Sequence, residues 1–252
     1  MLPPRQNRLR VIAHRGSSGT APENTMAAFR MAAEAGSDMI ELDVRLTLDG
    51  ELVVHHDRRI GRTTDGRGKI CNKTLQQIRR LDAGSWFSSL FAGERVPTLR
   101  EVLDWLPERL GLNIEVKTDG DRRRGLGLEK LCAVLLKETG IRRKILVTSF
   151  DHLFLGRLHH VDPLLSTGVL YGSIRDAGKL PSALARRVGA SAFICSRSQL
   201  RKRFVDDAHE HRLDVYCYGV NSTAHLAMAQ RLGVDAVITD YPDRIIHAVQ
   251  EG

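Results

Sequence analysis

The stretch MIELDVRLT, residues 39–47, alternates polar and apolar side chains over most of its length. Successive side chains of a β-strand point to opposite faces, so Glu41, Asp43 and Arg45 share one face of a predicted strand. The stretch LNIEVK, residues 112–117, repeats this pattern. Each strand is therefore predicted to have an apolar face that packs against covering helices and a polar face that points into an enclosed interior.

The polar faces of these two strands bring together three carboxylates. Burying a carboxylate costs free energy unless the group is paired or binds a metal. Glu41, Asp43 and Glu115 supply three hard oxygen ligands. That set suits Mg²⁺ or Ca²⁺ better than zinc, which favours nitrogen and sulfur ligands. The alternative is a structural network in which Arg45 and Lys117 neutralise the acids, and the alternation alone leaves both interpretations open.

Short apolar runs alternate with helical patterns along the whole chain. The runs typical of strands are 9–13, 39–47, 112–117, 145–149, 164–170, 192–196, 214–220 and 236–239. The helical patterns are 24–35, 98–109, 126–139, 151–160, 182–188, 199–212, 223–232 and 243–250, and Asn24 is the expected N-cap of the first. This order predicts parallel strands joined by right-handed crossovers. A (β/α)8 TIM barrel in a single domain, residues 1–252, fits the pattern, and so does an open doubly wound sheet.

One region, at about residues 58–97, interrupts the alternation. Asp49 and Gly50 favour a turn, and a strand-like segment follows at residues 51–56. The next forty or so residues are rich in Gly, Arg and Thr, which favour loops. They predict an insertion between the second strand and its helix. We expect it to lie over the C-terminal mouth of a barrel, as a lid or a substrate-selecting cap.

Two histidines follow strand-like segments at the same predicted end. His14 follows the first strand, and His56 ends the segment after the second. Histidines at one mouth can act as a general acid and a general base, because their pKa lies near neutrality. Arg15, next to His14, has the fork of donors that binds a phosphate. His55 is expected to point to the opposite face and to be structural.

The composition narrows the classes of function. The net charge of +8 favours an anionic partner, such as nucleic acid, an acidic membrane or a small phosphorylated substrate. Aromatic residues make up only 5% of the chain, which leaves little material for stacking bases. The densest basic runs, 122–124, 142–144 and 201–203, are interpreted as solvated surface.

Cysteine usage and hydropathy suggest the compartment. The four cysteines form no CxxC pair, so we expect reduced thiols in a cytoplasmic protein. Residues 1–10 are polar, so we expect no signal peptide there. No stretch approaches the roughly 20 apolar residues of a membrane span, so we expect no stable membrane insertion.

A series of short motifs runs through almost the whole chain. They are His14-Arg15-Gly16, APENT at 21–25, ELDV at 41–44, Val53-Val54 leading into His56-Asp57, Thr63-Thr64 with Gly66 and Gly68, PTL at 97–99, NIEVK at 113–117, SFD at 149–151, GVD at 233–235 and TDYP at 239–242. In their order and spacing they resemble the glycerophosphodiester phosphodiesterases of the bacterial, cytosolic type. The resemblance implies a TIM barrel with a small insertion after the second strand.

The resemblance also implies roles for individual residues. Glu41, Asp43 and Glu115 are expected to bind a divalent cation, Mg²⁺ or Ca²⁺. His14 and His56 are expected to be the acid–base pair, and Arg15 and Lys117 are expected to contact the phosphate. The implied reaction is hydrolysis of a small-molecule glycerophosphodiester to sn-glycerol 3-phosphate and an alcohol. It leaves open which histidine is the acid.

One position departs from the family pattern. Where the family usually has a tryptophan before a Thr-Val-Asn run, this chain reads Tyr218-Gly219-Val220-Asn221. Tyr218 is expected to replace that tryptophan as an aromatic wall of the glycerol pocket. The change puts the substrate preference in doubt rather than the chemistry.

Two alternatives compete with this function. A lysophospholipase D-type phosphodiesterase would keep the site but act on lysolipids, and its apolar entrance would come from Trp86, Phe87, Leu90 and Phe91. A protein that binds anions or nucleic acid without catalysis would explain the net charge. It would leave the inward carboxylates and the paired histidines unexplained, so nucleic acid is not the expected partner.

Overall fold

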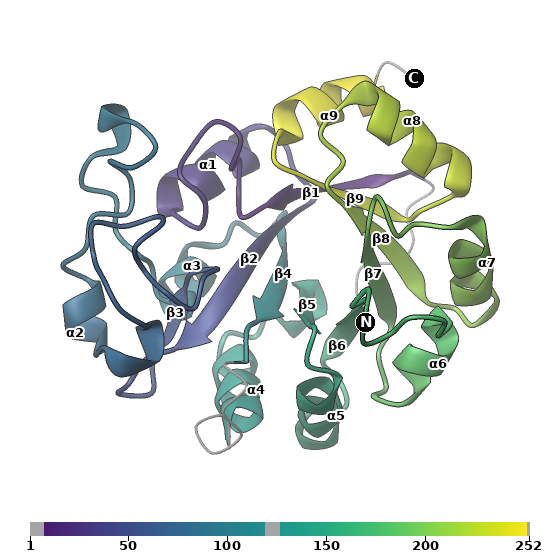
Figure 1. The fold of residues 1–252 in the computed structure, drawn as a ribbon, viewed down its shortest axis with the longest axis horizontal. Helices are drawn as coiled ribbons and strands as arrows, with labels where there is room; N and C mark the ends of the chain where they lie inside the picture. Colours follow the sequence, from purple (N-terminus) through teal and green to yellow (C-terminus); the bar gives the residue numbers. More distant parts are fainter. Residues whose placement is uncertain (1–7, 119–126, 251–252) are drawn as a thin grey trace.

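The computed structural model describes residues 8–118 and 127–250. Within them, eight parallel strands form a closed barrel, because β1 pairs with both β9 and β2. The strands are β1 Arg10–His14, β2 Met39–Leu46, β4 Gly111–Val116, β5 Ile145–Ser149, β6 Ser166–Leu170, β7 Ala192–Ser196, β8 Asp214–Tyr218 and β9 Ala236–Thr239. Closure confirms the predicted TIM barrel and excludes the open sheet (Figure 1).

Helices surround the barrel as an outer ring (Figure 1). They are α1 Met26–Glu34, α3 Leu99–Trp105, α4 Leu128–Glu138, α5 His152–Val161, α6 Pro181–Arg186, α7 Lys202–Glu210, α8 Thr223–Leu232 and α9 Pro242–Gln250. Two of them are each five residues shorter than predicted. The helix α3 ends at Trp105 because Leu106 precedes Pro107 and takes an extended ψ of 117°. The helix α7 begins only at Lys202, because the Gln199 side chain accepts hydrogen bonds from the N–H and the hydroxyl of Ser196 at the end of β7.

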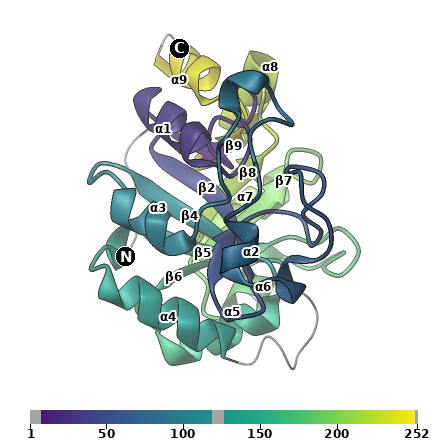
Figure 2. The ribbon, with the colours of Figure 1, turned by 90° about the vertical axis from the view of Figure 1, so that its left-hand side faces the viewer.

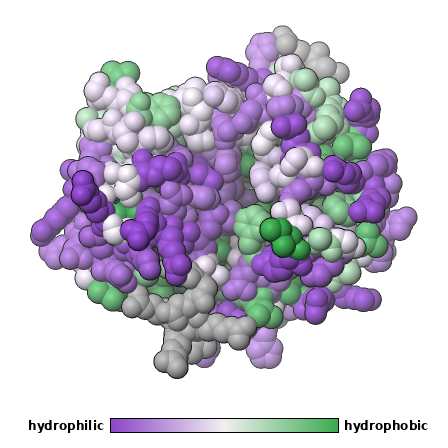
Figure 3. All heavy atoms as spheres, in the orientation of Figure 1, coloured by the Kyte–Doolittle hydropathy of each residue, from purple (hydrophilic) through white to green (hydrophobic). Residues whose placement is uncertain are grey.

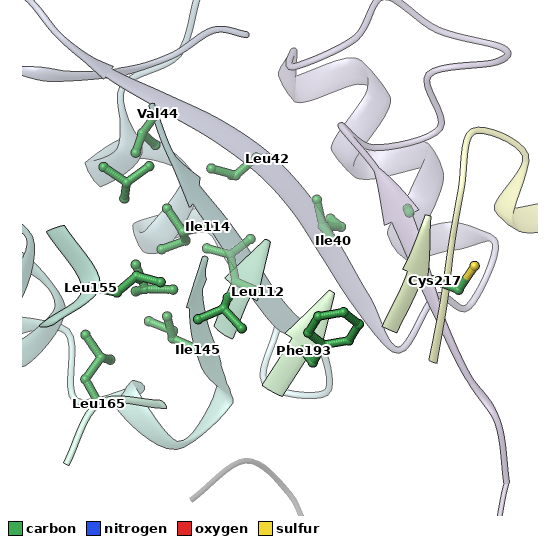
Figure 4. Close-up of a cluster of buried hydrophobic side chains, with 14 of the residues drawn as sticks. Ile40, Leu42, Val44, Leu112, Ile114, Ile145, Leu155, Leu165, Phe193 and Cys217 are labelled. Atoms are coloured by element: carbon green, nitrogen blue, oxygen red, sulfur yellow. The ribbon is translucent and has the colours of Figure 1, made fainter. Parts of the chain in front are cut away.

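The alternation within the strands divides the core into two layers. The outward side chains, such as Leu42, Val44 and Ile114, pack between the strands and the helices (Figure 4). Cys195 and Cys217 belong to this outer layer, so these two cysteines do not face the interior. A second apolar cluster lies inside the barrel: Ile12, Met39, Leu146, Leu170, Ala192, Ile194, Tyr216, Ala236 and Ile238.

The insertion follows β3 (Leu52–Val54), which pairs antiparallel with the end of β2. It contains the short helices η1 Ile70–Asn72, α2 Leu75–Ile78 and η2 Ser89–Phe91. A small core of its own comprises Val53, Ile60, Ile70, Ile78, Ala83 and Val96. Figures 1 and 2 show the insertion against the side of the barrel, next to β2, rather than across the mouth as expected for a lid. The antiparallel pairing of β3 with β2 is what directs the chain sideways.

The chain returns from the insertion to the barrel at the N-terminus of α3. Thr98 caps this helix in a capping box, in which its side chain accepts from the Glu101 N–H and the Glu101 carboxylate accepts from the Thr98 N–H. Thr98→Ala removes this cap, and we expect a loss of about 1 kcal/mol in the free energy of unfolding, measured by urea denaturation. Thr223→Ala is the control, because Thr223 is exposed and the cap of α8 is Ser222. Equal losses in the two variants would contradict the prediction.

Candidate active site

A cavity of about 230 Å³ opens at the C-terminal mouth of the barrel. Its lining residues are His14, Arg15, Glu41, His56, Asn113, Glu115, Lys117, Thr148, Phe150, Leu170, Ile194, Tyr218 and Ile238. Charged groups come from the β1, β2 and β4 side, and most apolar groups come from the opposite strands. In Figure 3, which shows the face of Figure 1, hydrophilic residues gather over the half that contains β2 and the insertion. Of the eight residues singled out from the sequence, only Asp43 is absent from the lining, because it is fully buried beneath it.

The three carboxylates meet at the floor of this cavity. Glu41, Asp43 and Glu115 each offer an oxygen, and these oxygens lie within 4.8 Å of one another. Burial, together with the nearby charge of Asp43, raises the pKa of Glu41 to about 8. Burial and the same charge raise the pKa of Glu115. For Asp43 burial acts in the same direction, but Lys117 and Arg15 outweigh it and its pKa is lowered.

The chemistry of this cluster fits a divalent cation. Asp43 Oδ1 is buried and accepts no hydrogen bond from the described residues, although Lys117 Nζ lies 3.0 Å away as an ion-pair partner. Burial and the like charges within the cluster raise the pKa values of Glu41 and Glu115, so a further cation would favour their ionised forms. Three carboxylate ligands are typical of Mg²⁺ and Ca²⁺ sites. Arg45, expected to neutralise the acids in the alternative interpretation, donates from Nε to the carbonyl of His56.

Asn24 holds Asp43 in place rather than capping α1 as expected. Its Nδ2 donates to Asp43 Oδ2 at 2.9 Å, and its Oδ1 accepts from the Asp43 N–H at 3.2 Å. The backbone of Asn24 is left-handed, with φ of 58°. The N-cap of α1 is Thr25, whose side chain accepts from the Ala28 N–H. Asn24 is thus a residue of the site, although its position before a helix predicted only a capping role.

A left-handed turn after β1 directs Arg15 into the site. Arg15 has φ of 55° and Gly16 has φ of 81°. A side chain at Gly16 would come within 2.6 Å of the Ala28 backbone, so this turn requires glycine. The Arg15 N–H donates to Glu41 at 2.9 Å, and its Nε lies 3.2 Å from Asp43. The guanidinium therefore faces both the acids and the cavity.

Lys117 is the second cation of the site. It follows β4 directly, and its Nζ is bonded to Glu115 and lies near Asp43. The same nitrogen lies 5.9 Å from the centre of the Phe150 ring. Burial lowers the pKa of Lys117, but Asp43 and Glu115 outweigh it and the pKa is raised. Lys117 therefore stays charged at neutral pH.

Each of the two cavity histidines is backed by a carboxylate. His14 Nδ1 is bonded to Asp240 at 2.6 Å, and His56 Nδ1 is bonded to Asp57 at 2.7 Å. Burial lowers the pKa of His14, but the Asp240 hydrogen bond and the Glu41 charge outweigh it, so that pKa is raised. Burial lowers the pKa of His56, and here the opposing charge of Asp43 does not outweigh it. The two rings therefore differ in protonation over a range around neutral pH.

Asp240 contacts a residue of the site, although the sequence did not single it out. It directly follows β9, and its carboxylate also accepts from Asn221 Nδ2 at 2.6 Å and from Ser18 at 3.2 Å. Its position after a barrel strand is the same signal that identified His14. His55, in contrast, is buried away from the cavity as expected, with its Nε2 3.1 Å from Thr63 Oγ1.

None of the described residues of the basic runs lines this cavity. Residues 142–144 form the short helix η3, and residues 201–203 lie at the start of α7. The run 122–124 lies outside the described residues. Among the described residues, no helix is long and apolar enough to cross a membrane.

The chain is similar in sequence to known proteins over almost its whole length. The Glycerophosphoryl diester phosphodiesterase family model matches residues 14–244. A glycerophosphodiester phosphodiesterase of Caldanaerobacter subterraneus is 36% identical over 96% of this chain and 98% of its own length. One from Bacillus subtilis is 34% identical over 98% of this chain and 88% of its own length.

Solved structures extend the agreement to the fold. A phosphodiesterase from Oleispira antarctica, solved in complex with the product sn-glycerol-3-phosphate, is 31% identical over 96% of each chain, with a TM-score of 0.86. A glycerophosphodiester phosphodiesterase from Agrobacterium tumefaciens is 31% identical and covers 93% of this chain and 97% of its own, with a TM-score of 0.81. The match over nearly the whole chain, in sequence and in fold, shows that this protein belongs to the glycerophosphoryl diester phosphodiesterase family and is a phosphoric diester hydrolase.

Proposed function

We propose that the protein hydrolyses glycerophosphodiesters to sn-glycerol 3-phosphate and an alcohol, with His14 and His56 as general acid and base and with a divalent cation, Mg²⁺ or Ca²⁺. The observation that carries the proposal is the meeting of two carboxylate-backed histidines, Arg15 and Lys117 around one buried acidic cluster. The relative from Oleispira antarctica that contains sn-glycerol-3-phosphate supports the product.

Glu41, Asp43 and Glu115 would hold the cation. When bound, such a cation compensates charge on the phosphodiester oxygens and favours the more charged transition state. Arg15 and Lys117 lie on either side of the acids, so their donors can bind the remaining phosphate oxygens. Tyr218 and Phe150 then form aromatic walls on the less charged side, where the glycerol carbons would lie.

The opposite pKa shifts of the two histidines suggest their roles. His14, held protonated by Asp240, is suited to give a proton to the departing alcohol. His56, held neutral by burial, is suited to take the proton from the glycerol 2-hydroxyl. That oxygen attacks phosphorus while the bond from phosphorus to the alcohol oxygen breaks. Water then opens the cyclic glycerol phosphate, and each histidine plays the reverse role.

The lysolipid alternative is not favoured by the position of its apolar residues. Leu90 is 89% exposed, and Trp86 and Phe87 are partly exposed. They lie around η2 at the far part of the insertion, and none of the described residues that line the cavity comes from residues 58–97. The ring contacts of Phe87 with Trp86 and Phe91 agree with packing within the insertion.

The first test is release of sn-glycerol 3-phosphate from glycerophosphocholine and glycerophosphoethanolamine, with Mg²⁺, with Ca²⁺ and with chelator. We expect release with a cation, none with chelator, and a loss of about 10²- to 10⁴-fold in kcat for His14→Ala. His160→Ala is the control, because His160 is exposed on α5. Release that persists in His14→Ala or in chelator would show that the chemistry lies in other residues.

The assigned roles predict a bell-shaped dependence of kcat/KM on pH. Activity should fall on the acid side when His56 gains a proton and on the alkaline side when His14 loses its own. Asp240→Asn removes the charge that raises the pKa of His14, so the alkaline limb should move to lower pH. Asp243→Asn, on the exposed surface of α9, should leave both limbs in place. An unmoved alkaline limb in Asp240→Asn would refute the assignment of His14 as the acid.

The cyclic route makes a separate prediction about the substrate. A glycerophosphodiester analogue without the 2-hydroxyl has no internal nucleophile, so it should not be turned over, although it should still bind as a competitive inhibitor. Product release by phosphorus-31 NMR measures the first expectation, and inhibition of glycerophosphocholine hydrolysis measures the second. Turnover of the analogue at the normal rate would instead indicate direct attack by water.

A further inference from the structure

A single guanidinium in the insertion binds two carboxylates at the rim of the cavity. Arg62 donates from Nη1 and Nη2 to the two oxygens of Glu23, at 2.8 and 2.7 Å. Its Nε donates to Asp57 Oδ2 at 2.6 Å, and Nη2 also reaches Asp57 Oδ1 at 3.3 Å. Glu23 lies in the loop between β1 and α1, and Asp57 lies at the start of the insertion. Arg62 therefore joins two parts of the chain that are far apart in sequence.

Each of these carboxylates also binds a group of the active site. Glu23 Oε1 accepts from Arg15 Nη1 at 2.8 Å, and Asp57 Oδ1 is bonded to His56 Nδ1 at 2.7 Å. The contacts form one chain: Arg15, Glu23, Arg62, Asp57 and His56. A displacement of Arg62 would therefore act on the phosphate-binding side and on the histidine at the same time.

The backbone on either side of Arg62 is held firmly. Ile60 is fully buried in the small core of the insertion, and Thr63 and Thr64 are buried as well. Thr64 Oγ1 donates to the Ile60 carbonyl at 2.6 Å, and Thr63 Oγ1 lies 3.1 Å from His55 Nε2. These contacts place the Arg62 side chain without relying on its own burial, since 46% of it is exposed.

Arg62 does not line the cavity, and its donors already bind carboxylates. It is therefore better placed to orient other groups than to bind the phosphate. The planar guanidinium group of arginine binds two carboxylates at once with a geometric specificity that the ammonium group of lysine lacks.

We propose that Arg62 is a positioning residue that holds His56 through Asp57 and Arg15 through Glu23, so that the insertion organises both sides of the active site from outside it. This inference rests on the proposed function for the role of His56 and Arg15. It predicts that loss of Arg62 impairs turnover and phosphate binding together, whereas loss of either carboxylate impairs mainly one of them.

The test compares Arg62→Ala, Asp57→Asn and Glu23→Gln. Turnover of glycerophosphocholine gives kcat, and isothermal titration calorimetry gives the affinity for sn-glycerol 3-phosphate. We expect Arg62→Ala to lower kcat/KM about 10- to 100-fold, as is typical when a supporting residue is lost. Asp57→Asn should lower mainly kcat, Glu23→Gln mainly the affinity, and Arg62→Ala both. Adding Asp57→Asn to Arg62→Ala should lower kcat little further.

Two further variants separate positioning from charge and from stability. Arg59→Ala removes an exposed arginine from the same segment and should change neither quantity. Arg62→Lys keeps the charge but loses the fork, so it should remain impaired with an unchanged thermal unfolding midpoint. Full activity in Arg62→Lys, or additive losses in the double variant, would overturn the inference. The binding experiment tests Arg62 even without turnover, whereas an inactive wild-type protein would count against the proposed function.

Discussion

Repulsion among three carboxylates at the floor of the cavity is the constraint on which the rest of the mouth depends. Glu41, Asp43 and Glu115 lie too close together in a buried site to be ionised without compensation. Arg15 and Lys117 supply part of it, and the Asn24 amide fixes the orientation of Asp43. The left-handed turn after β1 brings the Arg15 N–H to Glu41 and the Arg15 guanidinium to Asp43. A divalent cation would supply the remaining charge.

The two histidines show how one fold can hold similar groups in different protonation states. Both rings have a carboxylate on Nδ1, so the hydrogen bond alone does not distinguish them. Burial is the largest effect on both rings and lowers the pKa of each. For His14 the Asp240 hydrogen bond and the charge of Glu41, 4.0 Å away, outweigh burial, whereas for His56 the charges of Lys117 and Arg15 act in the same direction as burial. The two pKa values therefore diverge because charge is distributed unevenly around the mouth. Pairs of titratable groups with divergent pKa values are characteristic of acid–base sites.

The insertion contributes to the site without covering it. It lies beside β2, and its small apolar core supports the segment around Arg62. His56 and Asp57 lie between β3 and the insertion, so the antiparallel pairing of β3 with β2 determines where the second histidine enters the mouth. The expectation of a lid was wrong because a strand that turns back along β2 leads the following residues outward. The site therefore combines residues of the barrel with contacts from an insertion that lies beside it.

The sequence by itself determined the strands, their polar and apolar faces, and the group of acids and histidines at one end. It did so because side-chain alternation in a strand is a local property of the backbone. Closure of the barrel depends on pairing between β1 and β9, which no local pattern specifies. The same closure brings Asp240 to His14, 226 residues apart, and the fold of the insertion brings Arg62 to Glu23. These partners and the divergent pKa values were decided only by the tertiary structure, because they depend on distances between groups that the chain order leaves undetermined.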